Sequence, residues 1–151
     1  MRAFILGLLL TMVSSSALAA DEWQPIGPQE YASQGGPLTM KLVRDVQRGG
    51  VSIYIEKHDG QSCTQNGRDI GSPRPTSIKA YGEVSINGMT MAFNEACMNG
   101  NVVIYPISGD DAGLLGDLVA ANAPLHLVSL QGDNVTFANG NGRQILKQLQ
   151  Q

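Results

Sequence analysis

Hydrophobic and polar residues alternate along much of this sequence, and the alternation predicts half-buried β-strands. Residues 51–57 place Val, Ile and Ile on one side and Ser, Tyr and Glu on the other, and residues 38–46 alternate in the same way. A glycine turn joins the two segments, which predicts an antiparallel hairpin. A second hairpin is predicted for residues 77–86 and 89–95, because the Asn87-Gly88 pair between them tolerates the positive φ values of a type I′ turn.

Three further strands are predicted in the carboxyl-terminal half of the sequence. Residues 102–105 form a continuous apolar run, which is typical of a strand in the middle of a sheet. Residues 125–130 and 134–138 flank a Gly-Asp turn and predict a third hairpin. The alternating and apolar segments together predict about seven strands.

Two short segments follow a helical period instead. Ser108 can cap a helix whose first turn contains two aspartates, which are favourable at the positive end of the helix dipole, and apolar residues then recur at helical spacing. Ile145, Leu146 and Leu149 indicate a short amphipathic helix at the carboxyl terminus. We therefore expect residues 38–151 to form a single, mainly β domain, an antiparallel β-sandwich or half-barrel with one or two short helices, one of which covers an opening.

The first 37 residues lack this alternation. Residues 1–20 contain an arginine, an apolar run, three serines and an alanine-rich end, which is the pattern of a cleaved secretory signal peptide. Residues 21–37 contain three prolines and a glycine pair, and we interpret them as an extended arm rather than a regular element. The chain is therefore expected to be periplasmic or secreted, without membrane insertion once the signal is cleaved.

The two cysteines of the chain, Cys63 and Cys97, are expected to form a disulfide, because pairing is the default in an oxidising compartment. The bridge would close a loop of 34 residues (97 minus 63), which is worth roughly 3 to 4 kcal/mol on the chain-entropy model. The alternative is a reactive thiol, for which His58 or His126 would have to lie within hydrogen-bonding reach.

Composition excludes several functional classes. The 151 residues suffice for one small domain, and a net charge of -3 without a basic run provides no surface for nucleic acid. His58 and His126 stand apart from any cluster of cysteines or carboxylates, so the sequence predicts no zinc site. The glycine pairs lack the context of a dinucleotide site, and no acid–base cluster or nucleophile elbow is present. We predict a non-enzymatic protein without metal or cofactor.

Residues 60–76 lack periodicity and are expected to form a long loop, which the expected disulfide would anchor to the domain. The segment carries the polar side chains of Gln65, Asn66, Arg68 and Arg74. Long anchored loops often bind something, but a solvated loop that is merely stabilised by its disulfide explains the pattern equally well. The binding hypothesis places these four residues, with the two arginines foremost, in contact with a protein partner.

The order of features in the second half of the chain carries a family resemblance. A strand, turn and strand at residues 84–89 precede Phe-Asn-Glu-Ala-Cys-Met-Asn-Gly at residues 93–100, a helix opened by Asp110-Asp111, and a final strand pair with an amphipathic end. In this order residues 85–149 resemble the invasion-associated locus B family of exported bacterial proteins. The family usually has another cysteine just after the position of Cys97, which this chain lacks. The resemblance implies a periplasmic or surface-associated β-sandwich domain connected with host interaction or envelope function, and it transfers no active-site residues.

These observations favour an exported, disulfide-stabilised, non-enzymatic domain that binds a protein partner at the cell envelope or host interface. The alternative is a periplasmic inhibitor or immunity protein that blocks a hydrolase with its disulfide-held loop. Co-purification of one hydrolase in stoichiometric amount would favour the alternative. A third hypothesis, a small hydrolase that uses His58, would be dismissed by unchanged turnover in a His58→Ala variant.

Overall fold

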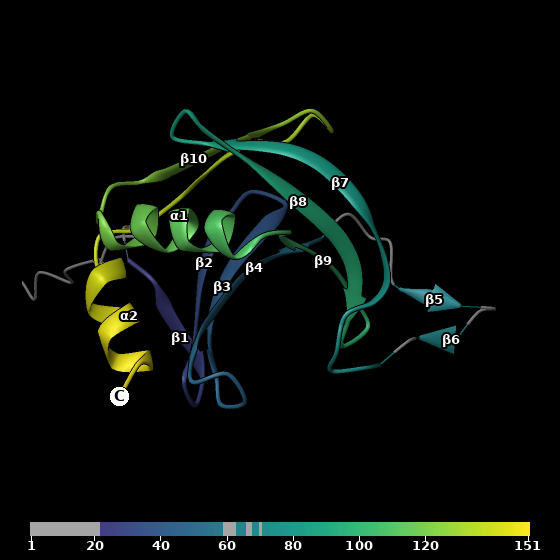
Figure 1. Cartoon of the computed structure of the whole chain (residues 1–151), viewed down its shortest axis with the longest axis horizontal. Helices are drawn as coiled ribbons and strands as arrows, with labels where there is room; N and C mark the ends of the chain where they lie inside the picture. The colour runs from purple at the N-terminus through teal and green to yellow at the C-terminus, as the bar shows by residue number, and fades with distance from the viewer. Residues whose placement is uncertain (1–21, 59–62, 66–67, 70) are drawn as a thin grey trace, which may run out of the picture.

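The computed structural model describes residues 22–58, 63–65, 68–69 and 71–151 (Figure 1). Nine strands form one antiparallel sheet in the order β1-β2-β3-β4-β9-β8-β7-β10-β11, which confirms the mainly β prediction. The strands of this sheet are β1 (Gln24–Gly27), β2 (Glu30–Gly35), β3 (Leu38–Asp45), β4 (Gly50–Lys57), β7 (Thr76–Ile86), β8 (Met89–Met98), β9 (Asn101–Pro106), β10 (Leu125–Ser129) and β11 (Asn134–Phe137). The remaining elements are the two-stranded sheet of β5 (Thr64–Gln65) and β6 (Arg68–Asp69), and the helices α1 (Gly109–Ala120) and α2 (Gly142–Leu149).

The large sheet is strongly curved, and its two ends approach each other without closing (Figure 1). Ser33 in β2 donates a hydrogen bond to the carbonyl of Ala138, just after β11, at 2.8 Å. Gly35 lies so close to the ring of Phe137 that a Cβ at this position would come within 2.7 Å of it. A glycine at position 35 therefore permits the close approach of the two ends that gives the sheet its half-barrel form.

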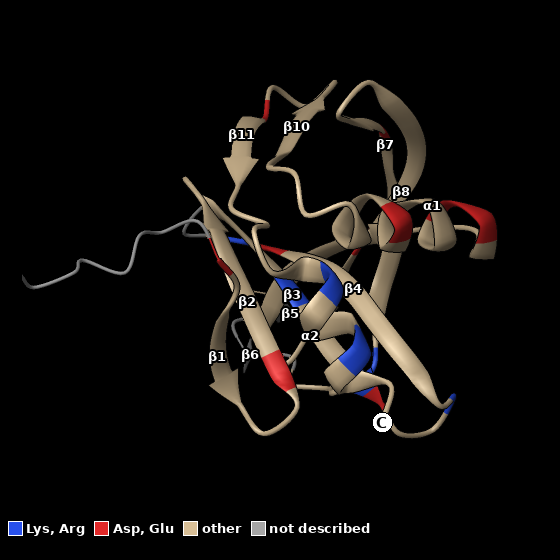
Figure 2. Ribbon diagram, turned by 90° about the vertical axis from the view of Figure 1, so that its left-hand side faces the viewer, with Lys and Arg blue, Asp and Glu red and all other residues tan. Residues whose placement is uncertain are grey.

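The core lies on the concave face of the curved sheet. Direct cross-strand partners share a face of a sheet, so Met40, Ile55 and Ile104 line up across β3, β4 and β9. The helices α1 and α2 lie together on this side and bury Leu115 and Ile145 among other apolar side chains (Figures 1 and 2). The largest fully buried side chains are those of Phe93, Phe137, Leu38, Met40, Leu42, Ile55, Ile86, Met91, Ile104, Leu115, Leu125 and Leu127.

The predicted hairpins and helices are present. The β7–β8 hairpin turns at Asn87 and Gly88, whose φ values of 52° and 81° are those of the predicted turn. β9 is central, as its apolar run indicated, because it lies between β4 and β8. Ser108 caps α1 by accepting a hydrogen bond from the backbone N–H of Asp111 at 3.0 Å. All seven strands expected from the sequence are therefore found in the large sheet.

The segment interpreted as an extended arm contains β1 and β2, so the sheet begins at Gln24 rather than near residue 38. β1 is an edge strand, where Pro25 is tolerated because one side of the strand needs no hydrogen-bonding partner. Before β1, Trp23 is buried and donates its indole N–H to Asn139 at 2.7 Å. The predicted signal peptide, residues 1–20, lies outside the described residues.

Candidate functional site

A groove opens where β4 and β9 separate. The two strands pair at three positions, from Ile55 opposite Ile104 to Lys57 opposite Val102. Beyond Ile104 the chain of β9 stays with β8 and ends at Pro106, which has no N–H to continue a ladder, and the next residues lead into α1. The first half of β4 stays paired with β3 alone, which leaves a groove with a volume of about 1210 Å³ between β4 and β9.

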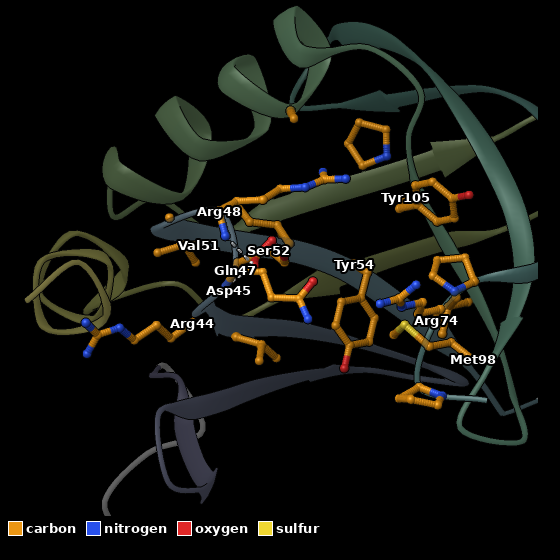
Figure 3. Close-up of a pocket in the computed structure, with 18 of the residues that line it drawn as sticks. Arg44, Asp45, Gln47, Arg48, Val51, Ser52, Tyr54, Arg74, Met98 and Tyr105 are labelled. Atoms are coloured by element: carbon orange, nitrogen blue, oxygen red, sulfur yellow. Dashed lines mark hydrogen bonds between the residues drawn. The ribbon is translucent and has the colours of Figure 1, made fainter. Parts of the chain in front are cut away.

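The groove is lined by segments that are far apart in the sequence (Figure 3). One wall is the β3–β4 hairpin, and the other contains the end of β9, the start of α1 and two short segments around residues 74 and 98. The half-buried Tyr54 and Tyr105 face it from β4 and β9. The lining residues are Val43, Arg44, Asp45, Val46, Gln47, Arg48, Gly50, Val51, Ser52, Ile53, Tyr54, Pro73, Arg74, Pro75, Ile78, Met98, Asn99, Val103, Tyr105, Pro106 and Ala112.

The charge of the groove is opposite in sign to that of the chain. Arg44, Arg48 and Arg74 line it, and none of their guanidinium groups forms an ion pair within the described part of the chain. Asp45 is the one carboxylate among the described lining residues, and its Oδ1 accepts hydrogen bonds from the backbone N–H groups of Gln47 and Arg48, each at 3.0 Å. Asp45 therefore stabilises the β3–β4 turn, and the groove is positive although the net charge is -3.

Tyr54 is held in its neutral form. Burial, together with the negative charges of Glu30 and Glu56, raises the pKa of the Tyr54 phenol to about 12. Both glutamates are neutralised in part by Lys41, whose Nζ lies 2.7 Å from Glu56 Oε2 and 3.8 Å from Glu30 Oε1. At physiological pH the phenol therefore keeps its proton and remains a hydrogen-bond donor.

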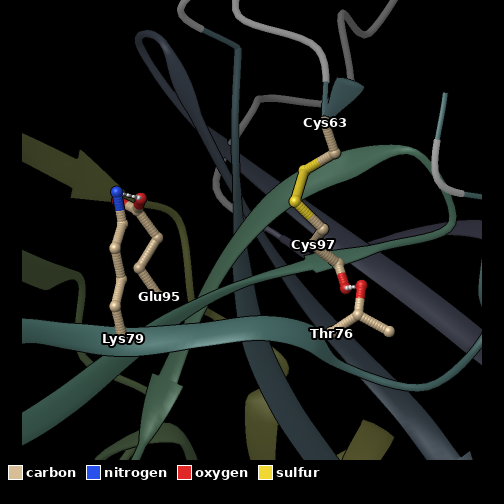
Figure 4. The surroundings of a disulfide bond; sticks show 5 residues. All are labelled: Cys63, Thr76, Lys79, Glu95 and Cys97. Carbon is tan, nitrogen blue, oxygen red and sulfur yellow. Dashed lines mark hydrogen bonds and ion pairs between the residues drawn. A yellow bond between two sulfur atoms is a disulfide. The ribbon is translucent and has the colours of Figure 1, made fainter. Parts of the chain in front are cut away.

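The predicted disulfide is present, and the reactive-thiol alternative is wrong for both cysteines. Cys63 and Cys97 are bonded, with their Cα atoms 5.6 Å apart (Figure 4). The backbone N–H of Cys63 also donates to the carbonyl of Gly100 at 3.2 Å, and Asn99 donates to the carbonyl of Ser72 at 2.6 Å. These contacts hold the segment that carries the partner-binding candidates against the end of β8.

The predicted partner-binding residues fall in different places. Arg74 is exposed and lines the groove. Gln65 and Arg68 are paired in register between β5 and β6, and Asn66 lies outside the described residues. The sequence did not indicate the other groove residues, among them Arg48 and the two tyrosines, because they lie on regular strands and a turn whose local patterns indicate only a hairpin and a sheet.

The two histidines are separate from each other and from the groove lining. His58 Nε2 lies 2.9 Å from Thr39 Oγ1, and His126 Nδ1 lies 3.1 Å from Thr136 Oγ1. His126 is exposed between two buried leucines, as the alternation predicted. Within the ranges that the structure describes, no three His, Cys, Asp or Glu side chains are placed to hold a metal ion.

No helix among the described residues is long and apolar enough to cross a membrane. Comparison of the chain with protein-family models, with curated proteins and with solved structures finds no match.

Proposed function

We propose that this chain is an exported, non-enzymatic domain that binds a segment of a protein partner in the groove between β4 and β9. The observation that carries the proposal is the presence in one groove of two half-buried tyrosines and three arginines that form no ion pair with any described residue. Arginine and tyrosine are enriched among the residues that contribute most to protein–protein binding. The volume of about 1210 Å³ is larger than the roughly 300–1,000 Å³ of a small-molecule site, which favours a polypeptide as the ligand.

The chemistry of the lining supports binding rather than catalysis. General acid–base catalysis needs a positioned group that can exchange a proton near neutral pH. Among the described residues of the lining there is no histidine and one carboxylate, that of Asp45, which accepts hydrogen bonds from the β3–β4 turn. The groove therefore offers hydrogen-bond donors and positive charge to a ligand but no poised base.

The proposed location is the periplasm or the outside of the cell. The Cys63–Cys97 disulfide fits an oxidising compartment, and the signal-like residues 1–20 agree with export. The resemblance of residues 85–149 to the invasion-associated locus B family points to the same setting.

Capture of the partner with matched charge variants tests the proposal. A photoreactive amino acid in place of Tyr105 would cross-link whatever occupies the groove, in extracts of the cell envelope and of the medium. We expect one protein to be cross-linked by the otherwise wild-type chain and by a Lys147→Glu variant, because Lys147 is on the exposed side of α2 and outside the groove lining. The Arg74→Glu variant carries the same charge change inside the groove and should give at least tenfold less cross-linked product than the Lys147→Glu control.

The outcome separates the hypotheses. Equal cross-linking by Arg74→Glu, Arg48→Glu and the Lys147→Glu control would contradict binding in the groove. Identification of the captured protein as a hydrolase that the chain inhibits would select the inhibitor or immunity function within the same binding mode.

A further inference from the structure

The edge of β4 inside the groove points to the conformation of the bound segment. We propose that the segment is an extended, acidic strand that pairs with β4 at Val51 and Ile53 and so fills the gap between β4 and β9. The inference rests on the proposed function and specifies its ligand. Three steps support it: the direction of the free backbone groups, the two walls of the groove, and its charge.

The first step concerns the free backbone groups of β4. His58, just after β4, donates its backbone N–H to the carbonyl of Pro37 at 2.8 Å. Because backbone groups point alternately to the two sides of a strand, the even-numbered residues of β4 bond to β3 and the odd-numbered ones point the other way. Ile55 pairs with β9 on that side, whereas no described strand lies beside Val51 and Ile53 there.

The β9 side of the gap offers no equivalent donor. The backbone groups of Ile104 point toward β4, where Ile104 pairs with Ile55. The next residue of β9 whose backbone groups point the same way is Pro106, which has no N–H. A strand entering the gap would therefore pair mainly with β4. Along the five residues of Gly50–Tyr54 the free edge is about 17 Å long at ~3.3 Å per residue, which suits a short extended segment.

The second step concerns the side chains that the added strand would meet. Successive side chains of a strand point to opposite faces. On the concave side they would meet Val51, Ile53 and Ala112 of α1, which are apolar, and on the convex side Tyr54 and Tyr105. The groove therefore suits a segment in which apolar residues alternate with polar ones.

The third step concerns the sign of the charge on the polar side chains. Figure 3 shows Arg44 extending away from the two tyrosines, whereas Arg48 and Arg74 lie on the side of the groove where the tyrosines are. A carboxylate can accept two parallel hydrogen bonds from one guanidinium group. Exposed edge strands are usually protected against pairing, and two flanking arginines would restrict this edge to segments with negative side chains.

Peptides of defined sequence test the inference directly. The probe is a fluorescein-labelled heptapeptide of alternating Glu and Val, and its control is the same peptide with Lys in place of Glu. Binding is measured by fluorescence anisotropy with the full chain in its oxidised form. We expect the acidic peptide to bind at least tenfold more tightly than the basic one, and Arg48→Glu or Arg74→Glu to remove this preference while Lys147→Glu retains it.

Methylation of the peptide backbone tests strand pairing without altering the protein. Because one alternate set of peptide N–H groups would face β4, N-methylation of that set should weaken binding at least tenfold, and methylation of the other set should change it less than about threefold. On the protein, Val51→Pro removes an N–H from the free edge and should weaken binding more than Val51→Ala, which loses only part of one apolar contact and keeps the N–H.

Each result bears on a separate claim. Strand pairing would be overturned if the two methylated peptides both lost binding to the same extent, or if neither lost it. The charge requirement would be overturned by an acidic peptide that binds no better than the basic one. In both cases cross-linking that depends on Arg74 would still support a protein partner in the groove. Loss of that dependence would overturn the proposed function itself.

Discussion

Asn139 connects three parts of the fold through one buried amide. Its Oδ1 accepts the indole N–H of Trp23 at 2.7 Å, and its Nδ2 donates to the carbonyls of Val119 at 3.0 Å and Ala123 at 2.9 Å. Asn139 is 1% exposed and Trp23 is 2% exposed, so water cannot replace the contact with the indole N–H in a variant that lacks the amide. Asn139 thereby joins the segment before β1 to the end of α1.

Replacement of Asn139 by alanine is expected to lower the free energy of unfolding by about 3 kcal/mol. The variant would leave the buried indole N–H of Trp23 without its acceptor, at a cost of about 1–3 kcal/mol. It would also lose the hydrogen bonds that Nδ2 donates to the carbonyls of Leu118, Val119 and Ala123, worth about 1 kcal/mol for each of its two N–H groups, part of which water recovers at the exposed Ala123. Because small domains are stable by only about 5–15 kcal/mol, the loss should shift the urea midpoint clearly.

Urea unfolding followed by far-UV circular dichroism would measure this loss. A double-mutant cycle with Trp23→Phe, which removes the indole N–H and keeps an aromatic ring, should show a coupling of about 1–2 kcal/mol between the two positions. A loss below about 1 kcal/mol for Asn139→Ala, or a coupling within the ~0.5 kcal/mol expected of independent sites, would refute the conclusion that residues before β1 are an integral part of the domain.

Three further predictions follow from other contacts. Replacement of both Cys63 and Cys97 by serine should lower the free energy of unfolding in urea by about 4 kcal/mol, because their bridge closes a separation of 34 residues, and a loss no larger than that of a surface Ser variant would contradict this. Gly35→Ala should cost about 1–3 kcal/mol through its contact with the Phe137 ring, and unchanged thermal stability would mean that the ends of the sheet do not approach as described. The ultraviolet titration curve of the wild type, after subtraction of the curve of a Tyr54→Phe variant, should show the ionisation of Tyr54 near pH 12. In the unfolded chain this tyrosine ionises at about pH 10, so Tyr54 should stabilise the folded state fully below pH 10 and lose this effect as the pH rises through 12. Ionisation of Tyr54 at pH 10 in the folded protein would contradict its burial.

Local patterns were sufficient for the elements that neighbouring residues decide. The Asn87-Gly88 turn, the Ser108 cap and the alternation of residues 51–57 each depend on interactions within a few positions, so the sequence alone predicted seven strands, two helices and a mainly β fold. The disulfide followed from having two cysteines and an export signal pattern. Arg74 was predicted as a candidate because it lies in residues 60–76, the long segment that Cys63 anchors.

Tertiary structure decided where the chain begins its sheet and where the groove opens. Pro25 argues against a strand when it is considered alone, and β1 exists because it lies at the edge of the sheet, where one side needs no hydrogen bonds. The groove exists because β9 leaves β4 after Ile104 to follow β8, while β4 continues with β3. Such a separation depends on pairing between strands that lie more than forty residues apart, and the hydrophobic period of either strand carries no information about which neighbour it keeps.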